Sequence, residues 1–244
     1  MPKTSVKPAT FSRCAERPSM SVAEPHRPTA QHHAASAAQR ALLAQLKARP
    51  RQPGEAGFFY IDNHFGRVAV KVLPGEYFVT GEDMLITTVL GSCIAACLWD
   101  GQARIGGMNH FMLPEGEQGD ASGRYGSYAM ELLINQMLKL GARRERLQAK
   151  IFGGGQVMHN FTTMNVGERN TRFVHEYLRT EHIPIVADDV LDIYPRKVAF
   201  FPMTGKAMVK RLAHAHPETL EAQETRGNAA LLAKTAAGGS IDLF

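Results

Sequence analysis

In the stretch TTVLGSCIAACLWD, residues 87–100, a cysteine lies at the start of an apolar, strand-like run. Gly91 and Ser92 precede Cys93 and predict a small, flexible turn. The backbone N–H groups of such a turn can converge on an oxyanion, which is the layout that an acyl-transfer nucleophile needs. Cys93 is therefore the candidate nucleophile, provided that a base lies within hydrogen-bond reach of its thiol.

The hairpin that follows offers a base. The turn signal DGQA joins the strand-like runs CIAACLWD and RIGGMNHFML. If Gly101 and Gln102 form a two-residue loop, Cys93 lies directly across from His110, with Cβ atoms about 4.5–5.5 Å apart. If the loop is Asp-Gly instead, Cys93 faces Met108 and the pairing weakens. Both registers stay open.

A hydroxyl beside the imidazole would complete this arrangement. Thr87 can hold the ring in the tautomer whose unprotonated nitrogen faces sulfur. The alternative for each residue is an ordinary core position, because cysteine in a strand is usually a small hydrophobe. Cys97 fits that alternative, since its neighbours are apolar. An extended strand separates Cys93 from Cys97 by about 13 Å, which excludes a disulfide between them.

Other motifs carry less chemistry. The run FGGGQVM has no following Lys-Ser or Lys-Thr, so Gly153, Gly154 and Gly155 do not form a phosphate-binding loop. We expect these glycines to let the backbone pass close to another segment, such as a cleft wall. Arg169 and Asn170 open a predicted helix and are interpreted as capping residues.

The elements around these residues predict an α+β fold. Strands are predicted at 83–90 and in two hairpins, the second of which turns at Thr204 and Gly205. Helical spacing of apolar residues predicts separate helices at 123–142, 167–183 and 217–237. This order favours a layered domain with a hairpin-rich mixed sheet and helices packed on it, and not a doubly wound sheet.

Composition divides the chain into three parts. Residues 1–57 are rich in Pro, Ala, Ser, His and Arg and are predicted to be a flexible, mostly disordered extension with one transient helix. The catalytic domain is expected at 58–212, and a helix and tail at 213–244. The net charge of +5 favours acidic partners in general but does not select nucleic acid. Without a signal peptide, a spanning run or a disulfide framework, the expected location is the cytoplasm.

Several of these motifs together resemble one family. The segments TTVLGSCIAACLWD, IGGMNHFMLP, GRYGSYAMELLINQML, VGERN and TGKAMVKRL, in this order, are similar to the CheD family of chemoreceptor glutamine deamidases. The likeness spans about residues 68–212. It implies a layered α/β sandwich similar to the catalytic domains of deamidating toxins. One departure is the loop near Asp192, where the family often has a glycine pair.

The resemblance implies a triad of Cys93 as nucleophile, His110 as base and Thr87 as the orienting residue, with Thr88 the less favoured claimant. Cys93 would attack a glutamine carboxamide of a methyl-accepting chemoreceptor and form a thioester, with the oxyanion held at the turn of Gly91 and Ser92. Ammonia would leave, and hydrolysis would yield glutamate without any metal or organic cofactor.

The same resemblance implies partners and a binding surface. The partners are the cytoplasmic domains of chemoreceptors, through which alone the protein would meet the membrane, and for some members a CheC-type phosphatase. A glutamine on a helical bundle requires an open cleft around Cys93, with Asn109 and the glycines Gly153, Gly154 and Gly155 on its rim. The rim segments would be 112–126 and 152–161.

Two other functions remain as alternatives. A non-catalytic regulator of the same fold would dock on receptors or on a phosphatase, but it has no need for the trio of Cys93, His110 and Thr87. Nucleic-acid binding through the basic extension lacks a recognition helix or an interleaved aromatic and basic strand pattern.

Overall fold

The computed structural model describes residues 36–113, 120–156 and 166–212, which form two five-stranded sheets and three α-helices. We name each sheet after the strand that borders the Cys93 turn. The β4 sheet has the order β1 (Phe58–Asp62), β2 (Arg67–Lys71), β4 (Leu85–Leu90), β9 (Arg196–Phe201) and β10 (Lys206–Arg211). The β5 sheet has the order β3 (Tyr77–Thr80), β6 (Ile105–Asn109), β5 (Ile94–Asp100), β7 (Leu147–Gly153) and β8 (Ile185–Val190).

Both sheets are mixed and rich in hairpins. Strands β2 and β4 pair in parallel, as do β7 and β8, and every other pairing within the two sheets is antiparallel. The hairpin of β9 and β10 turns where the sequence predicts, with Phe201 opposite Lys206. The α+β class is thereby confirmed, although the strands divide between two sheets instead of joining one.

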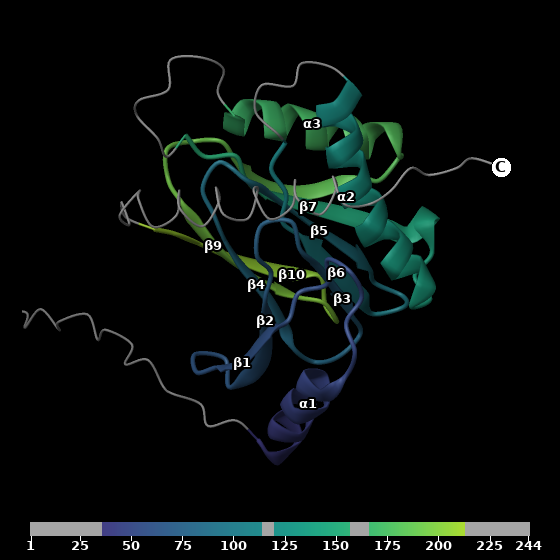
Figure 1. Cartoon of the computed structure of the whole chain (residues 1–244), viewed down its shortest axis with the longest axis vertical. Coiled ribbons are helices and arrows are strands. Elements are labelled where there is room, and N and C mark those ends of the chain that lie inside the picture. Colours follow the sequence, from purple (N-terminus) through teal and green to yellow (C-terminus); the bar gives the residue numbers. More distant parts are fainter. Residues whose placement is uncertain (1–35, 114–119, 157–165, 213–244) are drawn as a thin grey trace, which may run out of the picture. The chain divides into compact units, whose positions relative to one another are not determined.

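Helices cover one face of the β5 sheet. Helix α2 (Asp120–Lys139) contacts β3, β5 and β6, and helix α3 (Val166–Thr180) contacts β5 and β7. Figure 1 shows both helices on the same side of the sheets. One hydrophobic cluster lies between these helices and the β5 sheet, and a second lies between the two sheets. A short 3-10 helix (Arg144–Arg146) leads into β7.

The alternation of β5 residues assigns them to these two clusters. Ile94, Ala96 and Leu98 face the helices, whereas Cys93, Ala95 and Cys97 lie in the cluster between the sheets. Because successive strand residues point to opposite faces, every second residue from Cys93 to Cys97 faces the other sheet. The turn before β5 therefore places the Cys93 thiol between the sheets.

Helix α1 (Ala37–Ala48) begins well before the boundary expected at residue 58. The Ser36 hydroxyl accepts a hydrogen bond from the Gln39 backbone N–H at 3.2 Å and caps the helix. The Gln39 side chain accepts from the Val68 N–H at 2.6 Å, and Leu46 is buried against the β4 sheet. Residues 36–57 thus include a packed helix beside β1 and β2 (Figure 1).

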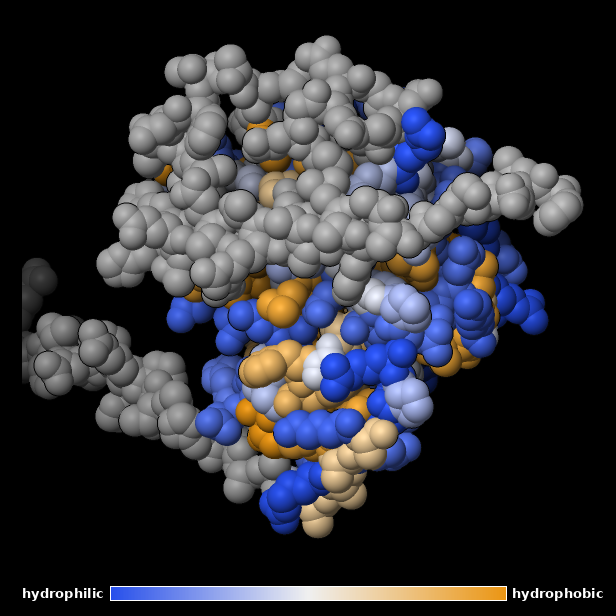
Figure 2. All heavy atoms as spheres, viewed as in Figure 1, coloured by the Kyte–Doolittle hydropathy of each residue, from blue (hydrophilic) through white to orange (hydrophobic). Residues whose placement is uncertain are grey.

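Some expectations lie outside the described residues. These are the extension before residue 36, the helix predicted at 217–237 and parts of both rim segments. Among the described helices, none is long and apolar enough to cross a membrane. Hydrophobic and hydrophilic residues are interspersed on the face drawn in Figure 2.

Candidate active site

The β5–β6 hairpin does not have either of the registers considered from the sequence. Asp100 pairs with Ile105, so the loop holds four residues, 101–104, instead of two. The Asp100 carboxylate sets this geometry, because its Oδ1 accepts the backbone N–H groups of Gln102 and Ala103, each at 3.0 Å. Arg104 then closes the loop in the left-handed region, with φ of 56°.

The new register moves His110 relative to Cys93. The bridge between Ile94 and Phe111 continues the pairing of β5 with β6, so Met112 is the residue opposite Cys93. The expected direct pairing of Cys93 with His110 is therefore wrong. A shift of two residues preserves the face, however, and the two side chains are diagonal neighbours, with Cα atoms typically about 7–8 Å apart.

Cys93 is buried, contrary to the expectation of an open cleft around it. Its exposed fraction is 0%, and its neighbours in the inter-sheet cluster include Leu90, Met112 and Phe152. Cys93 and Cys97 do not form a disulfide. Burial strongly raises the pKa of the Cys97 thiol, as expected for a cysteine that serves as a small hydrophobe.

His110 joins the two sheets through its Nδ1 atom. Nδ1 lies 2.9 Å from Thr88 Oγ1 and 3.4 Å from the Val72 carbonyl, both from the β4 side of the interface. The Thr88 hydroxyl donates its single hydrogen to the same Val72 carbonyl at 2.8 Å. Thr88 Oγ1 can therefore only accept from the imidazole, so the proton of the neutral ring lies on Nδ1.

The other ring nitrogen is left with a lone pair. His110 Nε2 is buried and has no hydrogen-bond partner among the described residues. Burial, opposed in part by the hydrogen bond to Val72, lowers the pKa of His110 to about 4, with a smaller contribution from the Lys71 charge. At neutral pH the ring is an uncharged base, and its Nε2 lone pair has no partner within the described ranges.

Thr87 does not orient this histidine. Its Oγ1 lies 2.9 Å from the Tyr60 hydroxyl and 3.2 Å from the Val70 carbonyl, on the outer face of the β4 sheet. Thr88 is the residue that contacts His110, because adjacent residues of β4 point to opposite faces. The alternation of Ile86, Thr88 and Leu90 toward the inter-sheet core is the sequence signal that could have selected Thr88.

Three successive carbonyls fix the turn that carries Cys93. The carbonyls of Gly91 and Cys93 accept the backbone N–H groups of Gly155 and Gly154, each at 2.8 Å. The Ser92 carbonyl accepts from the Asn170 side chain at 2.9 Å. The predicted oxyanion turn is thus a tightly bound piece of backbone.

Gly153 at the end of β7 and the two glycines that follow it are close to this turn and are buried, unlike the residues of an exposed rim. A Cβ atom on Gly153 would lie 2.1 Å from the Cys93 carbonyl oxygen, and one on Gly154 would lie 2.3 Å from Thr171 Oγ1. Both glycines have positive φ, of 110° and 65°. The run FGGGQ therefore exists for close backbone approach, as the sequence predicts.

Asn109 is not a rim residue either. It is buried on the helix side of the β5 sheet, where its Oδ1 accepts from the Ala96 N–H at 3.1 Å. Its Nδ2 donates to the Ala129 carbonyl of α2 at 3.0 Å. Because Asn109 and His110 are consecutive, one side chain faces the helices and the other faces the inter-sheet site.

The loop near Asp192 contacts the glycine run. Leu191 and Asp192 have φ of 62° and 68°, in the region that favours glycine, which is the residue expected there from the resemblance. Arg196, which is fully buried, holds the loop by donating to the Leu191 carbonyl at 2.6 Å. The Asp192 carbonyl in turn accepts from the Gln156 N–H at 2.7 Å.

Tyr125 of α2 is a neighbour of the site that the sequence did not single out. Burial raises the pKa of its hydroxyl, and the charge of Cys93 raises it further. The Tyr125 phenol is therefore close enough to Cys93 for the two groups to interact electrostatically.

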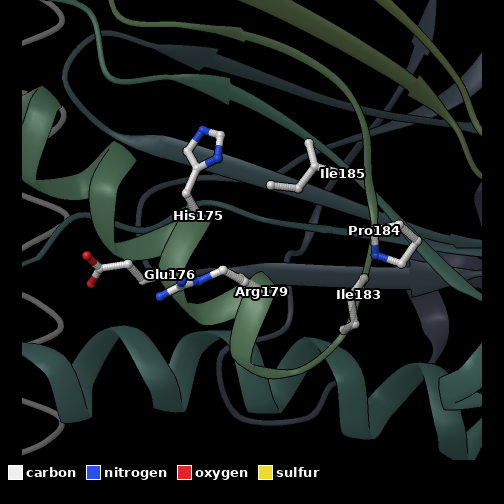
Figure 3. Close-up of a pocket in the computed structure, with 6 residues that line it drawn as sticks. All are labelled: His175, Glu176, Arg179, Ile183, Pro184 and Ile185. Carbon is white, nitrogen blue, oxygen red and sulfur yellow. The ribbon is translucent and has the colours of Figure 1, made fainter.

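A shallow pocket lies elsewhere, between α3 and the start of β8. His175, Glu176, Arg179, Ile183, Pro184 and Ile185 line it (Figure 3). None of these residues belongs to the site around Cys93. Within the described ranges, no group of three or more His, Cys, Asp or Glu side chains is arranged to hold a metal ion.

Comparisons with known proteins define the class to which this fold and site belong. The profile of a family described as "CheD chemotactic sensory transduction" matches residues 112–211. A protein of Albidiferax ferrireducens, named "Probable chemoreceptor glutamine deamidase CheD 1", is 70% identical over 200 residues, which are 82% of this chain and 86% of that protein. The chain belongs to the CheD family.

Further relatives agree with this assignment. Proteins of Methylobacillus flagellatus and Thiobacillus denitrificans, both named "Probable chemoreceptor glutamine deamidase CheD", are 53% and 55% identical and match 81% and 76% of this chain. The matches cover 100% and 94% of those proteins. The crystal structure of the Bacillus licheniformis hypothetical protein YfiH matches 48% of the chain at 13% identity, with a TM-score of 0.30 that is too low to establish a shared fold.

Proposed function

We propose that the chain is a cysteine-dependent deamidase that converts glutamines of methyl-accepting chemoreceptors to glutamates, and that it thereby contributes to chemotactic adaptation. The names of its relatives support the substrate class. The observation that carries the chemistry is the buried Nε2 of His110, which has no hydrogen-bond partner in the described part of the chain and lies on the same inter-sheet face as Cys93.

The reaction begins with transfer of the Cys93 thiol proton to His110 Nε2. The sulfur attacks the carboxamide carbon, and the carbonyl π electrons move to oxygen, where the turn at Ser92 and Cys93 supplies N–H donors. Collapse of this intermediate breaks the C–N bond, and His110 returns the proton to the leaving nitrogen as ammonia departs.

Hydrolysis then regenerates the enzyme. A water molecule gives one proton to His110 Nε2 while its oxygen attacks the thioester carbon. The C–S bond breaks, the thiolate regains the proton from His110, and the product is glutamate. Throughout both halves Thr88 accepts from Nδ1 and stabilises the imidazolium that forms in each transition state.

Burial of Cys93 adds a conformational step. Because the thiol has no exposed surface, a receptor glutamine reaches it only after segments over the inter-sheet cluster move. Such gating keeps bulk water from the thiol until substrate binds. Binding of a CheC-type phosphatase that modulates the activity remains a prediction from the family resemblance.

Mass spectrometry of purified receptor cytoplasmic domains tests the proposal. The full chain should release ammonia and convert particular glutamines to glutamate, and Cys93→Ala should abolish both. Cys97→Ala is the matched control, since Cys97 is equally buried in the same inter-sheet cluster, four residues after Cys93. It should retain activity once the loss of stability from the smaller side chain is allowed for. Equal conversion by wild type and Cys93→Ala would refute the role of Cys93, and conversion by neither would leave the docking regulator as the better function.

A further inference from the structure

The strongest unassigned feature of the site is the side chain of Asn170, in the first turns of α3. It is fully buried, with an exposed fraction of 0%. Its Nδ2 donates to the Ser92 carbonyl at 2.9 Å, and its Oδ1 accepts from the Leu113 N–H at 3.0 Å. One amide therefore links the residue before Cys93 to the segment three residues beyond His110.

These bonds go beyond capping of a helix. A capping asparagine accepts hydrogen bonds from the N–H groups of its own helix, whereas Asn170 uses both ends of its amide on other segments. The adjacent Arg169 reaches the same place, since its Nη2 donates to the Leu113 carbonyl at 3.0 Å. Both polar groups of Leu113 are thus bound by consecutive residues of α3.

The bond to Ser92 has a consequence for the next residue. A trans peptide unit is planar, so the N–H of Cys93 points in the direction opposite to the Ser92 carbonyl. Holding that carbonyl therefore fixes the direction of the Cys93 N–H. The carbonyls on either side, of Gly91 and Cys93, are held by backbone groups, so Asn170 is the side chain that completes the restraint.

We propose that Asn170 is a positioning residue that aims the Cys93 N–H at the developing oxyanion and keeps the nucleophile turn in register with the segment after His110. This role rests on the proposed deamidase function. An oxyanion donor contributes to the transition state and little to substrate binding, because charge on the oxygen develops only as sulfur attacks. Loss of Asn170 should accordingly lower kcat and leave KM near its wild-type value.

Two variants of Asn170 distinguish the effect of its hydrogen bond to Ser92 from the effect of its side-chain volume. Asn170→Ala removes both hydrogen bonds. Asn170→Asp keeps the shape and the acceptor for the Leu113 N–H, but its carboxylate cannot donate to the Ser92 carbonyl. Val174→Ala is the control, since Val174 is fully buried one turn further along the same helix and contributes only to the core. Folded fractions are measured by thermal unfolding, and rates are expressed per folded molecule.

We expect kcat for ammonia release to fall about 10- to 100-fold in both Asn170 variants. This decrease is smaller than the one caused by deleting an oxyanion donor, because the Cys93 N–H is still present and is only misaligned. Alkylation of Cys93 by iodoacetamide, which needs no oxyanion donor, should proceed at the wild-type rate. Val174→Ala should change neither rate. A kcat in both Asn170 variants that equals the value for Val174→Ala overturns the proposal, as does a rise in KM without a fall in kcat.

Amide hydrogen exchange at Cys93 distinguishes failure of this inference from failure of the proposed function. Loss of the Asn170 bond should accelerate exchange of the Cys93 N–H more than that of strand β7, whether or not the protein releases ammonia. Accelerated exchange in a chain that shows no deamidation would refute the function and retain the positioning of the turn. Unchanged exchange in an active chain would refute the role of Asn170 alone.

Discussion

Replacing Thr88 by valine deletes one hydroxyl and keeps the shape of a buried side chain. The change removes the 2.9 Å contact with His110 Nδ1 and the 2.8 Å bond to the Val72 carbonyl. The imidazole N–H then keeps only the Val72 carbonyl at 3.4 Å, beyond the usual range for such a bond. Thr88→Val therefore leaves a buried donor poorly satisfied and the ring of the proposed catalytic base poorly oriented.

The expected magnitude follows from the cost of an unsatisfied buried donor, which is about 1–3 kcal/mol. If the imidazolium of the transition state bears this cost, kcat falls about 5- to 150-fold, since each 1.4 kcal/mol is about a factor of ten. The assay is ammonia release from receptor cytoplasmic domains over a range of substrate concentrations. KM should change little, because the hydroxyl does not touch substrate.

Thr87→Val is the matched control on the same strand. Thr87 bonds to Tyr60 and to the Val70 carbonyl on the outer face, so its loss should cost stability and leave kcat unchanged. The opposite result, with Thr87→Val inactive and Thr88→Val active, would refute the assignment of the orienting role and favour the triad expected from the resemblance.

Two further predictions concern stability. Burial lowers the pKa of His110 from 6.5 in the unfolded chain to about 4 in the folded chain. Between these pH values the unfolded chain binds a proton that the folded chain does not. The free energy of unfolding is therefore highest above pH 6.5 and declines by about 3 kcal/mol as pH falls to about 4. Urea unfolding at several pH values should show this slope in wild type and not in His110→Gln; an equal slope in both would assign it to other groups. Asp100→Ala should lose at least about 2 kcal/mol, because it deprives the N–H groups of Gln102 and Ala103 and the Arg146 side chain of their acceptor. Asp100→Asn, which keeps an acceptor oxygen for the loop, should lose less in the same assay, and equal losses would show that the loop bonds contribute little.

Most elements could be predicted from local sequence. The helices at 123–142 and 167–183 correspond to α2 and α3, and the strands at 83–90 and 93–100 correspond to β4 and β5. The spacing of apolar residues differs between helices and strands, and glycine and turn residues mark where each element ends, so a short segment is enough to predict its own structure. Helix α1 is predicted only as transient, because its stability comes from contacts with β1 and β2, which no local pattern reports.

The site was predicted less completely than the fold. The type of each residue and the spacing along the chain nominated Cys93 and His110, and strand alternation placed them on one face whether the loop held two residues or four. The exact register depended on the Asp100 carboxylate, whose bonds to loop N–H groups exist only once the hairpin has formed. A prediction of hairpin loop length from backbone turn preferences alone does not include such a side-chain acceptor.

The sequence by itself determined the class of fold and the family, and it nominated Cys93 and His110 as candidates, since these follow from residue types and from periods that repeat along one segment. Only the tertiary structure decided that Thr88 and not Thr87 contacts the His110 ring, that Asn170 donates a hydrogen bond to the Ser92 carbonyl, and that Cys93 lies between two sheets. Each of these facts depends on contacts between segments distant in the chain, such as Val72 with His110 and Ser92 with Asn170. Such contacts arise from the packing of whole layers, and packing depends on every residue of a layer at once.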